Sequence, residues 1–308
     1  MPNTINYAES WNPGLLTATI QGTLTSAHIT SNVAWEGART FHFTAMSTSG
    51  YRNHTAGGKI KRGVLTQTDV PFSFTHDRSI AFLVDKSEVQ DSHYTADIQK
   101  VAERFQRTKG APEVDALFFE TVAQKAKAAN LYDETAIGTI NKTNVFEKLK
   151  GALSKVKRYR GSLICYVKTP VMDALELALA DKAKIEWTSI SGLEFSIETR
   201  VAKLDGVVII EVIYDDRFYT KFDYLDTEQG GFTPNGAGKP INFLFASTET
   251  CLTVKRIQSI YINAPGTHTE GDGWYFQMRD NWDTFVLPNG KDGKVDSCYV
   301  SYDNSEAA

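Results

Sequence analysis

Residues 107–122 read Arg-Thr-Lys-Gly-Ala-Pro-Glu-Val-Asp-Ala-Leu-Phe-Phe-Glu-Thr-Val, and this stretch decides the central helix of the fold. Pro112 suits the first helical position, and Glu113 and Asp115 oppose the positive end of the helix dipole. The apolar residues that follow recur at helical spacing and predict a buried face made of Val114, Leu117, Phe118 and Val122. Asn130 is a suitable C-terminal cap. The sequence therefore predicts a long helix that starts at Pro112.

Two segments with alternating apolar residues precede this helix, one on each side of the loop sequence 47–58. Trp35, Phe41, Phe43 and Ala45 share one parity in the first segment, and Val70, Phe72 and Phe74 share one parity in the second. The pattern predicts a long β-hairpin. A two-stranded hairpin is marginal alone in water, so this one needs a surface to lie on.

The chain before the hairpin and the chain after it have different characters. The first 35 residues carry one formal charge, Glu9, and predict an extended arm rather than a helix. A short helix is expected over 95–108. Asn144 and Glu147 resemble a capping box that opens a third helix. A buried strand over 162–168 and a helix from Thr169 follow. The remainder is mostly β, with strands expected at 207–213, 241–246, 259–262, 274–279, 283–287 and 295–302, and a hairpin turn at 289–293.

Composition excludes several classes of protein. The chain has 308 residues and a net charge of −4, which argues against nucleic-acid binding by bulk charge. It contains no apolar run long enough for a membrane span, and no secretory signal is expected at its N-terminus. Cys165, Cys251 and Cys298 stand far apart without a CxxC pair, which predicts reduced structural thiols.

Signatures of enzymes are absent. Residues 230–239 resemble a phosphate-binding loop, but Thr233 and Pro240 replace required residues, so we interpret the segment as a flexible loop. The histidines show no metal-binding spacing, and Cys165 is typical of a small core residue. The acidic residues between Asp215 and Asp226 are interpreted as a solvated face. We therefore predict no catalytic residue, no cofactor and no metal.

Two motifs and the order of the elements carry a resemblance to a known family. Arg107-Thr-Lys followed by Pro112-Glu-Val-Asp115, and Arg279-x-x-Trp282-Asp-Thr-Phe-Val286, resemble motifs of tailed-bacteriophage major capsid proteins with the Hong Kong 97 fold. The resemblance covers essentially the whole chain and implies an α+β fold with four parts. These are an N-terminal arm (1–31), an extended loop or E-loop (32–76), a peripheral domain (77–135 and 250–308) with a long spine helix, and an axial domain (136–249).

The resemblance also implies a function and partners. The expected function is self-assembly, through pentamers and hexamers, into an icosahedral shell around packaged double-stranded DNA. A separate scaffolding protein, a portal and non-specific contact with the DNA are implied, with no membrane. The protein would be made in the bacterial host cytoplasm and end in the virion capsid. An encapsulin-like or gene-transfer-particle shell protein stays open as an alternative, as does a soluble intracellular enzyme that uses the acidic 215–226 loop.

Charge patterning predicts the subunit interfaces of such a shell. The tip of the E-loop is basic, and we expect it to contact an adjacent subunit through Tyr51, Arg52, Lys59, Lys61 and Arg62. Eight acidic residues in 266–308 are the expected partners. In the axial loop, we expect Arg217, Lys221 and Asp223 to lie near a capsomer axis. The arm is expected to extend across a neighbouring subunit.

Overall fold

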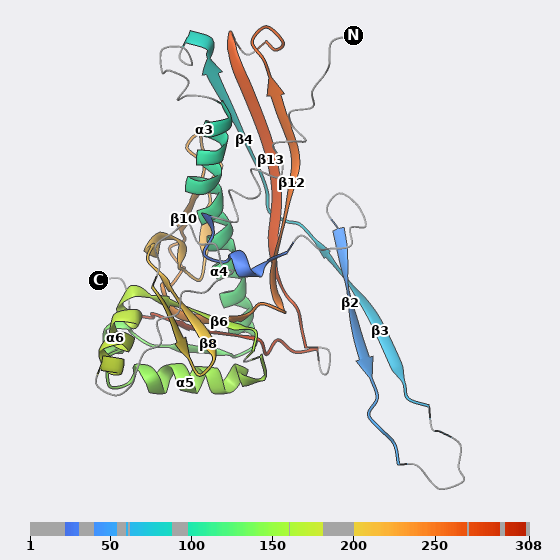
Figure 1. The fold of residues 1–308 in the computed structure, drawn as a ribbon, viewed down its shortest axis with the longest axis vertical. Coiled ribbons are helices and arrows are strands. Elements are labelled where there is room, and N and C mark those ends of the chain that lie inside the picture. The colour runs from blue at the N-terminus through green and yellow to red at the C-terminus, as the bar shows by residue number, and fades with distance from the viewer. Residues whose placement is uncertain are drawn as a thin grey trace.

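The computed structural model describes residues 22–30, 40–53, 60, 62–87, 98–159, 161–180, 200–269, 271–289 and 293–305. Two sheets, one of six strands and one of four, are connected by a long helical run, and a two-stranded hairpin projects away from them (Figure 1). The α+β fold class predicted from the sequence is confirmed.

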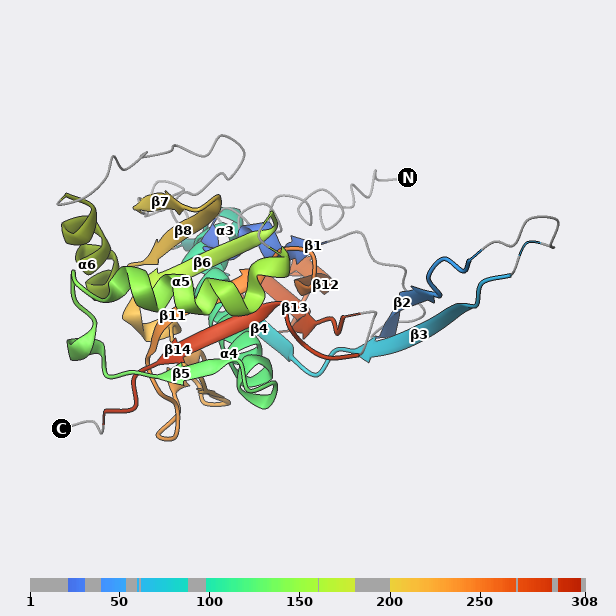
Figure 2. The same cartoon turned by 90° about the horizontal axis from the view of Figure 1, so that it is seen from below.

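The six-stranded sheet forms the core of one half of the molecule. Its strand order is β5-β14-β11-β6-β8-β7. Helices α5 (Val145–Val156) and α6 (Thr169–Ala180) pack on one face, and α4 (Ala111–Ala128) packs on the other (Figure 2). The strands are β5 (Tyr132–Glu134), β14 (Cys298–Tyr302), β11 (Ile241–Ser247), β6 (Leu163–Lys168), β8 (Val207–Val212) and β7 (Val201–Leu204).

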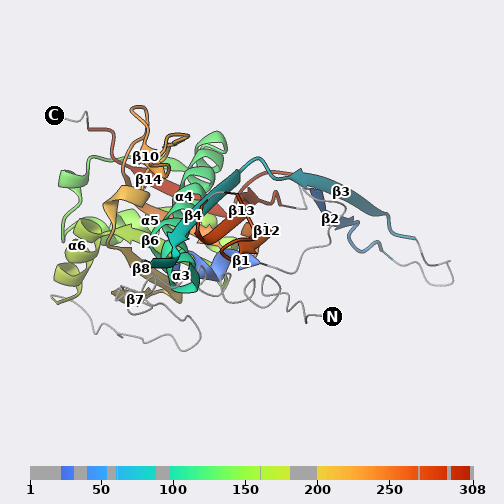
Figure 3. The ribbon, with the colours of Figure 1, turned by 90° about the horizontal axis from the view of Figure 1, so that it is seen from above.

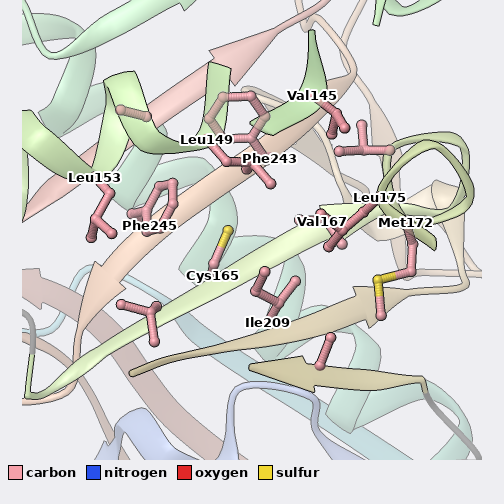
Figure 4. Close-up of a cluster of buried hydrophobic side chains, with 14 of the residues drawn as sticks. Val145, Leu149, Leu153, Cys165, Val167, Met172, Leu175, Ile209, Phe243 and Phe245 are labelled. Carbon is pink, nitrogen blue, oxygen red and sulfur yellow. The ribbon is translucent and has the colours of Figure 1, made fainter. Parts of the chain in front are cut away.

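Strand β6 is apolar from Leu163 to Val167 because both of its faces are covered. Leu163, Cys165 and Val167 belong to the cluster beneath α5 and α6 (Figure 4), whereas Ile164 and Tyr166 belong to the cluster beneath α4. A strand covered on both faces needs apolar residues at every position. The predicted buried strand is confirmed, and so is the interpretation of Cys165 as a core residue.

The helix predicted to begin at Pro112 is longer than expected. Helix α3 (Ile98–Phe105) continues through a π-helical segment, Gln106–Gly110, directly into α4. Phe105 and Gly110 both keep right-handed helical backbone angles, so Pro112 does not start a new helix. Proline lacks an amide hydrogen and crowds the preceding turn, and the wider π turn before it offers room for the ring. The end of α4 is as predicted, with Asn130 at φ 57° in the left-handed region.

The third helix begins where the sequence predicted, but without a capping box. Helix α5 starts at Val145 and its N-cap residue, Asn144, makes no side-chain hydrogen bond to the first turn. Its Oδ1 instead accepts the amide of Asn141 at 2.9 Å, and its Nδ2 donates to the carbonyl of Thr139 at 2.7 Å. Asparagine side chains compete for nearby backbone groups in this way, so the motif alone was a poor guide.

The four-stranded sheet has the order β1-β12-β13-β4, with bounds Ile29–Thr30, Cys251–Asn263, Gly273–Val286 and Asp77–Asp85. The sequence predicted two strands where β13 runs unbroken. The intervening Asp280 lies in the strand because its carboxylate pairs with Lys255 Nζ at 3.1 Å, and Asp283, which follows, accepts the hydroxyl of Thr75 at 2.7 Å.

The predicted closing set of antiparallel strands is also corrected. Strands β13 and β14 belong to different sheets, so the turn after Asn289 joins two sheets and is not a hairpin turn. Its outer hydrogen bonds are nevertheless those of a tight turn, since the amide of Asn289 donates to Lys294 and that of Gly293 donates to Asn289. Local sequence predicts such a turn but not the sheet that each flanking strand joins.

The predicted hairpin is present. Strands β2 (Thr40–Thr48) and β3 (Leu65–Ser73) pair antiparallel, and the register places Phe41 opposite Phe72 and Phe43 opposite Val70. Seen from above, the pair extends well beyond the rest of the molecule (Figure 3). At its base, Phe72 and Phe74 pack with Phe285 of β13. Within the described residues, the hairpin is therefore anchored at its base.

Candidate subunit interface

The tip of the β2–β3 hairpin is exposed and apolar. The strands are joined there by hydrogen bonds from Ser49 N to Val64 O and from Val64 N to Ser49 Oγ, both 2.9 Å. Beyond this clamp Tyr51 is fully exposed and Ile60 is 87% exposed, while Val64 and Leu65 are 60% and 61% exposed. Apolar side chains gathered on a projecting, uncovered hairpin are typical of a surface that another chain covers.

Two cations flank these apolar side chains. Arg52 and Arg62 are exposed at the tip. Lys59 and Lys61, which the sequence also placed at this interface, lie outside the described residues. A hollow of about 600 Å³ opens at the tip, lined by Thr48, Ser49, Gly50, Tyr51, Arg52, Asn53, Ile60 and Gly63. The tip thus offers aromatic, aliphatic and cationic groups to a partner.

Among the residues that the structure describes, the four-stranded sheet has one face covered by α3 and one face with exposed side chains, here called the bare face. Ile260, Phe276 and Val84 point toward α3 and are buried with Ala102. Residues of the other parity face away from the helix. Among them Tyr261 is 60% exposed and Leu83 is 47% exposed. The strand register brings this face together, because Leu83 pairs with Tyr275, and Tyr261 with Gln277.

In the axial loop, Arg217 is engaged within its own subunit. Its guanidinium is buried, and Nη1 lies 2.9 Å from Asp115 Oδ2 in α4 of the same chain. A contact of Arg217 or Lys221 with a neighbouring subunit's carboxylates stays a prediction. Lys221 and Asp223 are exposed beside the short ribbon of β9 (Phe222–Tyr224) and β10 (Phe232–Pro234). Their expected place near an axis of the shell stays a prediction.

The glycine-rich segment that follows β9 is more ordered than the flexible loop we predicted. Backbone hydrogen bonds from Leu225 to Gly231 and from Gly238 to Asn235 close it into successive turns. Arg78 of β4 donates to the carbonyls of Leu225 and Gly231, both at 3.1 Å. The loop therefore packs against the four-stranded sheet of its own subunit.

Asp115 is the anchor of this region, and the sequence analysis missed its role. Its carboxylate accepts the amides of Leu24 and Thr25 at 3.1 Å and the Thr25 hydroxyl at 2.8 Å, in addition to Arg217. Complete burial raises the pKa of this carboxyl, and Arg217 and the amide donors oppose that rise. A signal was available, because Asp115 lies on the same helical stripe as Phe118, Phe119 and Val122.

The whole arm was predicted to extend across a neighbouring subunit, but residues 22–30 instead pack on their own subunit. Leu24, Thr25 and His28 are buried against α4 and β12, and β1 pairs in parallel with β12. His28 Nδ1 lies 2.8 Å from the carbonyl oxygen of Cys251, and its ring lies 4.5 Å from that of Phe118. This segment belongs to the core of its own subunit; residues 1–21 and 31 lie outside the described residues.

Four of the acidic residues expected to face the hairpin of another subunit are engaged internally. Asp280 and Asp283 are bound as described above, Asp296 accepts the hydroxyl of Tyr159 at 2.8 Å, and Asp303 accepts the amide of Ser305 at 2.8 Å. These four carboxylates are thus engaged within their own subunit, and the expected contact of the acidic segment with another subunit's hairpin stays a prediction. Counting charges along a sequence does not distinguish surface carboxylates from those that satisfy buried donors.

No metal site and no membrane span arise among the residues that the structure describes. No group of three potential ligand side chains is present there, and no helix in that part of the chain is long and apolar enough to cross a bilayer.

The fold is that of known shell proteins. The structure resembles the capsid of the cyanophage P-SCSP1u with a TM-score of 0.57 at 11% identity, covering 92% of this chain and 89% of that chain. It resembles the mature capsid of bacteriophage PhiM1 (TM-score 0.52, 14% identity, covering 87% and 83%). It also resembles a virus-like particle from Pyrococcus furiosus (TM-score 0.51, 12% identity, covering 96% and 100%).

Sequence comparison adds nothing to this, since no protein-family model and no curated protein matches. The likeness is one of fold, and it runs through nearly the whole chain. The α+β fold that the sequence motifs implied is confirmed as one shared with capsid structures.

Proposed function

We propose that this chain is the major capsid protein of a tailed phage and assembles into an icosahedral shell around double-stranded DNA. The observation that carries the proposal is the match of nearly the whole chain to capsid structures. The exposed apolar tip of the projecting hairpin supports it, because a solitary subunit would leave that surface in water. The role is structural, and catalysis is not part of the proposal.

The parts of the subunit follow from the same proposal. We assign residues 32–76 to the E-loop, 77–135 with 250–308 to the peripheral domain and 136–249 to the axial domain. Residues 1–31 are the N-terminal arm, of which 22–30 are held by Asp115. The proposed partners are other copies of the chain in pentamers and hexamers, a separate scaffolding protein and a portal. The proposed location is the virion capsid, after synthesis in the host cytoplasm.

Electron microscopy of the purified full chain tests the function. Hollow or filled shells of uniform diameter are expected, either spontaneously or at high protein concentration. Nuclease treatment followed by extraction then separates the two kinds of shell: protected double-stranded DNA indicates a phage head, and its absence from particles made in infected cells indicates a protein compartment. Small soluble oligomers at every concentration, with no shells in infected cells, would contradict the proposal.

The proposed receiver of the hairpin tip is the bare face of the four-stranded sheet in an adjacent subunit. That face presents Tyr261 and Leu83, and the exposed Asp85 has the same parity on β4 as Leu83. Apolar groups would therefore meet apolar groups, and Arg52 and Arg62 would approach a carboxylate. Complementary charge of this kind fixes register and speeds encounter more than it adds affinity.

Replacing Tyr51 and Ile60 together by serine is expected to reduce shell assembly by at least about tenfold, because each removes an exposed anchor worth about 1–2 kcal/mol per contact. Leu177→Ser is the control, because Leu177 is an exposed apolar side chain on α6, away from the hairpin (60% exposed), and this variant should assemble normally. Light scattering measures assembly, and circular dichroism checks that both variants fold. Equal assembly of the two variants would exclude the tip as a contact.

Charge reversal tests the electrostatic part separately. The double variant Arg52→Glu, Arg62→Glu is expected to assemble more slowly than wild type at low salt. Raising the salt to a few tenths molar should reduce this difference in assembly rate, because screening shortens the range of charge interactions. A difference in assembly rate that does not change with salt would show that these side chains act through packing and not through charge.

A further inference from the structure

Two cysteines meet where the two sheets join. Cys251 is the first residue of β12 in the four-stranded sheet, and Cys298 is the first residue of β14 in the six-stranded sheet. Only three residues separate β11 from β12, and Cys298 pairs with Ala246 near the end of β11. The amide of Ser247 also donates to the carbonyl of Ser297 at 3.2 Å. The backbone therefore fixes the two cysteines side by side.

Their thiols are in contact. Both residues are fully buried in the same apolar cluster, and a side-chain hydrogen bond links the two thiols. This hydrogen bond lowers the pKa of Cys251, against the effect of burial, while the pKa of Cys298 is raised well above its usual value. The Thr250 hydroxyl lies 3.9 Å from Cys251 Sγ. Cys251 is thus the better nucleophile of the pair, because the thiolate is the attacking form.

The third cysteine cannot join them. Cys165 lies on the face of β6 that packs against α5 and α6, whereas Cys251 and Cys298 belong to the cluster beneath α4. The six-stranded sheet separates the two groups. Burial alone raises the pKa of Cys165. It provides a matched buried thiol without a cysteine partner.

We propose that Cys251 and Cys298 form an intrachain disulfide bond when the protein meets a two-electron oxidant, and that this bond locks the two sheets together. Two S–H bonds break and one S–S bond forms. Two electrons and two protons pass to the oxidant, for example a diazene that is reduced to a hydrazine. The Cys251 thiolate adds to the oxidant first, and Cys298 then attacks the Cys251 sulfur and displaces the hydrazine.

The bond would close the loop that contains β12 and β13. Closing a loop of that length restricts the unfolded chain and so stabilises the folded one. The inference rests on the subunit alone and not on the proposed function. A reducing cytoplasm would keep the thiols free during synthesis, and an oxidising exterior would close them afterwards.

The test uses the purified full chain, treated with diamide and then alkylated with a maleimide after denaturation. Wild type and Cys165→Ser are expected to lose two hydrogens in the intact mass, and the Cys251 and Cys298 sites should take no label. Cys298→Ser should keep its mass and label fully. The apparent unfolding temperature of oxidised wild type should rise by about 5 °C and that of Cys298→Ser should not.

Because both cysteines are buried, the oxidant could fail to reach them in the native protein. The reaction is therefore repeated at a denaturant concentration just below the unfolding transition, where the oxidant has access. Peptide mapping that finds a Cys251–Cys298 link under either condition supports the proposal, and Cys251→Ser should abolish the link in the same way as Cys298→Ser. Full labelling of all three cysteines under both conditions would overturn it. A link that involves Cys165, or links only between chains, would also overturn it.

Discussion

Replacing Asp115 with alanine is expected to lower the free energy of unfolding by about 3–5 kcal/mol, because it leaves a buried charge without its partner. The Arg217 guanidinium is almost completely buried, and its nearest carboxylate is that of Asp115, at 2.9 Å. The same substitution removes the acceptor for the amides of Leu24 and Thr25. Residues 22–30 should therefore loosen, and limited proteolysis should cut there first.

Two further variants identify the cause of that loss. Asp115→Ala combined with Arg217→Met is expected to recover a large part of the stability, since removing both charges removes the unpaired one. Lys150→Ala breaks an exposed ion pair with Asp205 at 3.8 Å and should cost less than about 1 kcal/mol. Denaturant titrations measure all three variants. A loss at Asp115→Ala no greater than that at Lys150→Ala would contradict the structural role assigned to the pair.

Acid is expected to destabilise the subunit through His28 by a similar amount. Burial lowers the pKa of this imidazole from 6.5 to about 4. Between those values the unfolded chain binds a proton at this site and the folded chain does not, so stability falls as pH falls. The contribution of His28 is complete above about pH 6.5, and about 3 kcal/mol of it is lost by pH 4.

A comparison of wild type with His28→Phe isolates this contribution, because other titrating groups cancel in the difference. Phenylalanine keeps the ring between Phe118 and Tyr166 but cannot be protonated. The difference in unfolding free energy between the two proteins should change by about 3 kcal/mol between pH 6.5 and pH 4. Two curves that stay parallel across that interval would show that the buried ring is not the acid-sensitive group.

Much of the fold follows from local sequence. The period of two in the hairpin, the uniformly apolar strand β6 and the asparagine at the end of α4 each specify their element through backbone geometry. The order of these elements, with the motifs around Arg107 and Trp282, implied the capsid fold. These inferences succeeded because each depends on residues a few positions apart.

The errors share one cause, which is contact between distant parts of the chain. Proline prefers the first position of a helix, yet Pro112 follows a π turn within one continuous helical run from α3 to α4. Asp280 and Asn281 break a strand by propensity, yet β13 continues because Lys255 pairs with the Asp280 carboxylate.

The sequence by itself determined the projecting hairpin, the buried strand β6 and the α+β class of fold, because periodicity and turn residues act locally, but it did not predict strands such as β4 and β7. Only the tertiary structure decided which charges face water. Asp115 and Arg217 are separated by 102 positions, and the sequence predicted no contact between them, but they form a buried pair whose carboxylate also binds residues 24 and 25. A charge can be buried only where its partner is already in place, and the partner is chosen by the packing of the whole chain.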